Sequence, residues 1–109
     1  MADAVLELPA AADMHVHLRQ GSLMRMVVPK LCDGGVGIAY VMVRAPPGRP
    51  FAHRDAPAMF AWKREAVAYR AELEKLVPPG SVTFMMTLYL CPDLTPDEIW
   101  KAKEAGIAG

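Results

Sequence analysis

Two runs of this chain are apolar at nearly every position, and they restrict its fold more than any other feature. They are residues 36–43 (Val-Gly-Ile-Ala-Tyr-Val-Met-Val) and residues 82–90 (Val-Thr-Phe-Met-Met-Thr-Leu-Tyr-Leu). A strand that is apolar on both faces is typical of a parallel sheet covered by helices. Another strand is predicted at residues 11–18, where polar and apolar side chains alternate.

Helical patterns separate the predicted strands. Pro29 should kink or divide the first of them, and the last begins with a capping box, Thr95-Pro96-Asp97-Glu98. The predicted helices cover residues 23–32, 58–77 and 96–105. Alternating strands and helices predict an α/β fold with a parallel sheet and right-handed crossovers. Residues 44–57, which include four prolines, are predicted to form an irregular loop.

The composition restricts the class of protein. The chain has 109 residues, of which 53% are hydrophobic and 22% charged, a balance that argues against disorder and suggests one small domain or a piece of a larger one. The formal net charge is zero, so nothing points to nucleic acid or to a membrane surface. Cys32 and Cys91 match no metal or redox spacing, and the N-terminus lacks the pattern of a signal peptide. We therefore expect a cytoplasmic location.

The polar side of the first predicted strand carries the candidate chemistry. Asp13, His15 and His17 fall on one face if the side chains alternate, with Met14, Val16 and Leu18 on the other. Imidazoles at positions i and i+2 lie about 6.6–6.8 Å apart along a strand, so both can reach one metal ion.

Other interpretations of these residues exist. A single histidine on a strand is more often structural than a ligand, although two beside an aspartate favour metal binding. A catalytic zinc needs three protein ligands. The remaining histidine, His53, reads as a solvated loop residue. Arg19 follows the strand and could grip a carboxylate through two hydrogen bonds, or it could be an ordinary surface arginine.

The segment Asp13-Met14-His15-Val16-His17-Leu18-Arg19 closely resembles the opening signature of the dihydroorotases, the cyclic amidohydrolases of pyrimidine synthesis. The likeness continues in Val27-Val28-Pro29, Tyr40-Val41-Met42, Ala68-Tyr69-Arg70 and Met86-Thr87-Leu88-Tyr89-Leu90. It is closest to the short, single-function form of bacteria and fungi, and it covers nearly the whole chain except residues 43–65.

This resemblance implies a metal-dependent (β/α)8 barrel that interconverts N-carbamoyl-L-aspartate and dihydroorotate. By resemblance, His15 and His17 would bind the more buried of two zinc ions, and Arg19 would bind the substrate carboxylate. Zinc-bound hydroxide would attack the ring amide, because the metals lower the pKa of that water and polarise the carbonyl. An eight-unit barrel needs about 250 residues, so this chain would hold the first three βα units, an incomplete barrel.

The chain also departs from the family pattern. Gln20 replaces an aspartate, and Val43 and Arg44 stand where the family has proline and a substrate-binding asparagine. The metal-bridging lysine, the later histidine ligands and the catalytic aspartate have no counterparts here, so no catalytic residue is assigned. Our first interpretation is that residues 1–109 are an N-terminal fragment of a dihydroorotase-like barrel, inactive on its own.

Two alternatives from other classes stay open. The chain could be a non-catalytic assembly piece whose exposed third-strand edge docks onto a full-length homologue or onto a second copy, forming a homo-oligomer. It could also be a small independent α/β domain that binds metal through Asp13, His15 and His17.

Overall fold

The computed structural model describes residues 3–42 and 63–109. Its elements along the chain are β1 (Ala11–Val16), α1 (Gly21–Val27), α2 (Pro29–Asp33), β2 (Val36–Val41), α3 (Lys63–Glu74), β3 (Thr83–Met86) and α4 (Pro96–Glu104). The predicted loop at 44–57 and the first part of the predicted helix 58–77 lie outside the described residues.

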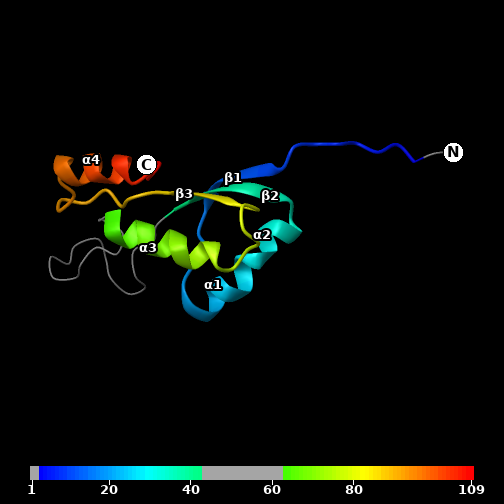
Figure 1. The fold of residues 1–109 in the computed structure, drawn as a ribbon, viewed down its shortest axis with the longest axis horizontal. Coiled ribbons are helices and arrows are strands. Elements are labelled where there is room, and N and C mark those ends of the chain that lie inside the picture. Colours follow the sequence, from blue (N-terminus) through cyan, green and yellow to red (C-terminus); the bar gives the residue numbers. More distant parts are fainter. Residues whose placement is uncertain (1–2, 43–62) are drawn as a thin grey trace.

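The strands form one parallel sheet in the order β1-β2-β3. Helices α1, α2 and α3 lie on one side of this sheet, and α4 lies beside the continuation of the chain beyond β3 (Figure 1). The prediction of an α/β fold with a parallel sheet is therefore confirmed.

The pairing of β1 with β2 shifts register twice. The first shift comes between the pairs Ala11–Val36 and Ala12–Ile38, which leaves Gly37 as an extra residue on β2. A Cβ atom at Gly37 would lie 2.9 Å from the Cβ of Ala10, so glycine allows the close approach of the two chains. The second shift lies within β1 itself, beside the candidate site.

Burial alternates along the strands. Ala39, Val41, Phe84 and Met86 are buried, and they pack with residues of α1 and α3 in one hydrophobic core. Ile38, which alternates with them, is 40% exposed. In the described part of the chain, the helices therefore cover one face of the sheet, and the prediction that the strands bury both faces is wrong for this chain alone.

Pro29 divides the first helical segment as expected. α1 ends at Val27, Val28 has helical backbone angles, and Pro29 opens α2 at its first position. Proline is well tolerated there because the first helical N–H has no partner within the helix. Val28 and Leu31 face the core, so both short helices stay attached to the sheet.

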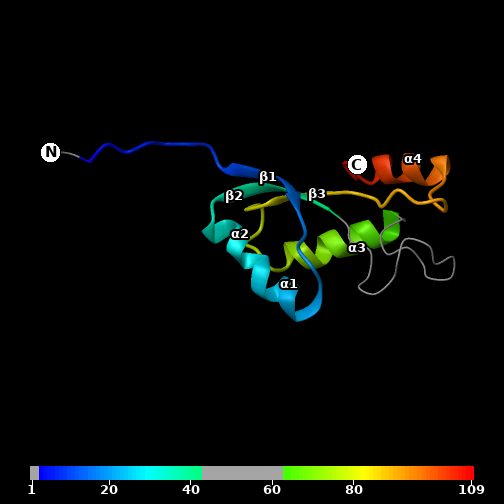
Figure 2. The same ribbon diagram turned by 180° about the vertical axis from the view of Figure 1, so that it is seen from behind.

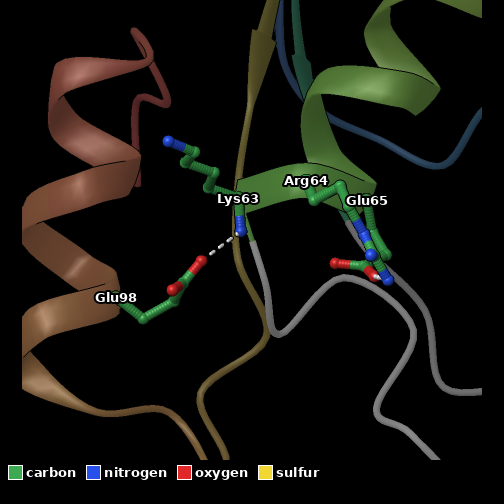
Figure 3. A network of polar contacts seen from close by, with 4 residues as sticks. All are labelled: Lys63, Arg64, Glu65 and Glu98. Atoms are coloured by element: carbon green, nitrogen blue, oxygen red, sulfur yellow. Dashed lines mark hydrogen bonds and ion pairs between the residues drawn. The ribbon is translucent and has the colours of Figure 1, made fainter.

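Thr95 caps α4 as the capping-box pattern predicts, since its side chain accepts a hydrogen bond from the backbone N–H of Glu98 at 3.3 Å. The Glu98 carboxylate, which a capping box would direct back to Thr95, instead accepts a hydrogen bond from the backbone N–H of Lys63 at 2.8 Å. Figure 3 shows this side chain reaching from α4 to the start of α3.

The last residues of the chain run along the continuation of β3. Ala108 donates a backbone hydrogen bond to the carbonyl of Met86 at 2.8 Å, and Leu88 donates one to the carbonyl of Gly109 at 2.6 Å. The edge that the assembly interpretation expected to be exposed is therefore partly occupied by the chain itself.

At the other end, residues 3–10 extend away from the body (Figures 1 and 2), and Val5, Leu6 and Leu8 are each at least 75% exposed. Among the described residues, no helix has the length and apolar character needed to cross a membrane.

Candidate metal and substrate site

The candidate site lies where β1 ends and the chain turns toward α1. β1 carries an extra residue between Asp13, which pairs with Ala39, and Val16, which pairs with Val41. Such a bulge re-aims the side chains that follow it. Val16 and Leu18 pack into the core as predicted, but Met14 remains 59% exposed, so the predicted apolar stripe is interrupted.

The two histidines come together as the alternation predicts. The ring centroids of His15 and His17 are 5.4 Å apart, with the planes at 73° in an edge-to-face arrangement. His15 is exposed and His17 is half-buried, directly beyond the last residue of β1. Nδ1 of His17 is buried and has no hydrogen-bond partner. A buried polar atom without a partner is costly, so this nitrogen suits a ligand that the chain alone does not supply.

Asp13 does not join the histidines as a third ligand. Its Oδ1 accepts a hydrogen bond from the backbone N–H of His15 at 3.1 Å, which directs the carboxylate along its own strand. Across residues 3–42 and 63–109, no group of three His, Cys, Asp or Glu side chains is arranged to hold a metal ion. The structure thus offers a pair of imidazoles rather than a complete metal site.

Arg19 begins the turn with an unusual backbone. Its φ is +63°, the left-handed region that a residue other than glycine enters at a cost of about 1–3 kcal/mol. The side chain is exposed, and no described carboxylate forms an ion pair with it. Its guanidinium is therefore available for a carboxylate from outside the chain.

Tyr69 of α3 belongs to this site, although the motif gave no reason to place it there. Its hydroxyl donates a hydrogen bond to the backbone carbonyl of Arg19. Burial raises the pKa of Tyr69 to about 12, while the positive charge of Arg19 opposes that rise. In the sequence, Tyr69 stands out only as part of Ala68-Tyr69-Arg70, which resembles the family, and that likeness gives it no role in the site.

Other residues singled out in the sequence lie outside the described part of the chain. They are Val43 and Arg44, which replace a family proline and asparagine, and His53.

No family model matches the sequence. The chain is nevertheless 40% identical over 104 residues to a probable dihydroorotase of Schizosaccharomyces pombe, covering 95% of this chain and 27% of that protein. It is 39% identical over 99 residues to the dihydroorotase of Saccharomyces cerevisiae, covering 91% of this chain and 24% of that protein.

The fold is also similar to that of a dihydroorotase. The chain is similar to a crystal structure of Saccharomyces cerevisiae dihydroorotase in complex with 5-fluoroorotic acid, with a TM-score of 0.75 and 38% sequence identity. That match covers 95% of this chain and 25% of the other. The chain therefore spans about a quarter of the length of the relatives it matches.

Proposed function

Because this chain is homologous to the N-terminal portion of dihydroorotases, we propose that it forms the first part of a zinc-dependent cyclic amidohydrolase barrel. The complete protein would interconvert N-carbamoyl-L-aspartate and dihydroorotate. The observation that carries the proposal is the paired histidines at the end of β1, followed two residues later by an arginine with no ion pair among the described residues.

The uncovered face of the sheet supports a barrel. Ile38 on that face is 40% exposed, whereas the alternate positions Ala39 and Val41 are fully buried against the helices. In a (β/α)8 barrel, helices cover the outside of the strands, and side chains from the other strands fill the inside. Three βα units of such a barrel would leave their inner face open, as β1, β2 and β3 do.

His15 and His17 fit a zinc ion as two of its ligands. Their rings are close enough to share one ion, and His17 has a buried nitrogen that lacks a partner. They do not make a whole site, because a catalytic zinc takes three protein ligands and no third donor stands beside them in the described residues. When bound, zinc would supply a water of lowered pKa and a polarised carbonyl.

Arg19 is proposed to hold the carboxylate that both substrates carry. A guanidinium matches a carboxylate with two parallel hydrogen bonds, which fixes orientation as well as position. Its place two residues beyond His17 would keep the bound carboxylate next to the reacting ring. In this proposal the chain orients substrate and supplies part of the metal site, and the proton-transferring group comes from elsewhere in the barrel.

A chimera tests this proposal. The matching quarter of Saccharomyces cerevisiae dihydroorotase is replaced by this chain, and hydrolysis of dihydroorotate is measured with zinc supplied. We expect activity that His15→Ala and His17→Ala abolish and that His53→Ala leaves intact. A soluble, zinc-loaded chimera without activity would contradict the proposal.

The chain by itself is expected to be inactive, because two imidazoles do not complete a catalytic metal site. Purified residues 1–109 with zinc should therefore not hydrolyse dihydroorotate. Turnover that His15→Ala removes would show that the chain assembles a site without the rest of a barrel.

A further inference from the structure

Tyr69 links a long helix to the turn that carries Arg19. The connection from β1 to α1 passes beside α3 (Figure 2), and there the Tyr69 hydroxyl donates a hydrogen bond to the Arg19 carbonyl. The two residues are 50 positions apart in sequence, so this contact exists only in the folded chain.

The hydrogen bond acts on a strained backbone. Arg19 has φ +63°, Gln20 is extended at φ −144°, and Gly21 has φ +61°. A side-chain-bearing residue keeps a left-handed conformation only where its surroundings hold it there. The carbonyl that accepts from Tyr69 belongs to the peptide between Arg19 and Gln20, so this contact fixes the orientation of that peptide.

Tyr69 is itself held firmly. Only 9% of its surface is exposed, and it belongs to the same core as Leu18 and Leu73, both fully buried. The ring therefore cannot swing away without opening the core. Its hydroxyl also stays protonated, and so remains a donor, at any pH near neutrality because burial raises its pKa to about 12.

We propose that Tyr69 is a positioning residue for the substrate site: its hydroxyl holds the Arg19 backbone in the left-handed conformation and so fixes where the guanidinium leaves the turn. This inference rests on the proposed role of Arg19 in carboxylate binding. It gives α3 a role in the substrate site, which the histidine motif on β1 alone does not predict.

Tyr69→Phe tests the proposal, because it removes the hydroxyl and keeps the ring in the core. In the isotope-labelled chain, we expect the carbonyl ¹³C resonance of Arg19 to move. The backbone order parameters at Arg19 and Gln20 should fall from about 0.85 toward 0.6. Tyr89→Phe removes the hydroxyl of a half-buried tyrosine three residues beyond β3; it is the matched control and should change neither. Unchanged Arg19 signals in Tyr69→Phe would overturn the proposal.

A second variant separates positioning from simple packing. Arg19→Gly should raise the urea midpoint in the wild-type background, since glycine adopts this backbone without strain. In the Tyr69→Phe background the gain should be smaller, because the freed turn has already relaxed. Equal gains in both backgrounds, or a fall of the midpoint in Arg19→Gly alone, would overturn the proposal even if Tyr69→Phe folded poorly.

The proposed role of Arg19 in carboxylate binding is measured in a separate titration. N-carbamoyl-L-aspartate is titrated into the labelled chain, and the side-chain Nε–H signal of Arg19 is followed. We expect this signal to shift in the wild type. In Tyr69→Phe the ligand concentration that gives half of the shift should be at least severalfold higher. A wild-type signal that never shifts would count against the carboxylate role of Arg19, whereas the carbonyl resonance and the double variant would still decide the role of Tyr69.

Discussion

The carboxylate of Glu98 accepts a hydrogen bond from the backbone N–H of Lys63 at 2.8 Å, so the first turn of α4 is tied to the start of α3. Seven residues after Lys63, the guanidinium of Arg70 donates to two carbonyls just beyond the end of α4, that of Ala105 at 3.3 Å and that of Gly106 at 3.4 Å. These two contacts show that α3 and α4 run parallel, with one charged side chain joining them near the start of α4 and another just beyond its end. Charges of these signs also favour the helix ends that they contact.

Glu98→Ala should lower the free energy of unfolding by about 1–2 kcal/mol, because it removes both this hydrogen bond and an acidic group from the first turn of α4. Glu98→Gln keeps an acceptor oxygen and should cost less. Urea unfolding measures both. Glu74→Ala, an exposed glutamate on α3, is the control and should stay within about 0.5 kcal/mol of the wild type. Equal losses at positions 98 and 74 would argue that the contact contributes nothing.

Arg70→Ala should loosen the end of α4 more than the rest of the fold. Its two acceptors are the carbonyls of the C-cap residue Ala105 and of the following Gly106, and a hydrogen bond from a charged donor is worth about 1.5–3 kcal/mol before solvent screening reduces it. Hydrogen exchange should show reduced protection for the last amides of α4, with little change in α1. Arg25→Ala, at an exposed arginine of α1, is the matched control, and a uniform loss of protection across all helices would contradict this role for Arg70.

Local sequence patterns predicted the ends of helices well where a few neighbouring residues determine them. Pro29 divides the first helical segment and Thr95 caps α4, both as expected, because each effect acts within a few residues; the Glu98 half of the capping box is not formed. Long-range partners were not predictable in this way. Arg70 and Glu74 lie one helical turn apart with opposite charges, yet Arg70 donates to the carbonyl of Ala105 at the end of α4, 35 residues away in sequence. Trp100 on α4 is large and apolar, yet it is 63% exposed, with the ammonium group of Lys103 over its ring.

The candidate site shows the same limit. The alternation of side chains along a strand correctly predicted that His15 and His17 lie together, because their spacing is local. The same alternation predicted Asp13 beside them, but its carboxylate accepts a hydrogen bond from the backbone N–H of His15. An extra residue in β1 between Asp13 and Val16 also changes which face of the strand the following side chains occupy. Tyr69 reaches the site only through the packing of α3, which no spacing rule contains.

Zinc binding separates the fragment interpretation from that of an independent metal-binding domain. In residues 3–42 and 63–109 no third ligand stands beside His15 and His17, so the pair should bind zinc only weakly, and His15→Ala or His17→Ala should remove that binding. Calorimetric titration at neutral pH measures it, with His53→Ala as the control that keeps both site histidines. A tight site, with a dissociation constant of about 1 μM or below, would instead favour an independent metal-binding domain.

Tyr69 should make the stability of the fold depend on alkaline pH. Its pKa is about 12 in the folded chain, mainly because burial disfavours the phenolate, whereas an unfolded tyrosine titrates near its ordinary value of about 10. Between these values the unfolded chain binds fewer protons, so the contribution of Tyr69 is fully present below pH about 10 and is lost as the pH rises through about 12. The urea midpoint is measured at pH about 8 and at pH about 11.5. Between these two values it should fall more in the wild type than in Tyr69→Phe, which has no proton to lose at this position. Tyr89→Phe should follow the wild type, and an equal fall in the wild type and Tyr69→Phe would show that the Tyr69 hydroxyl is not the group that titrates.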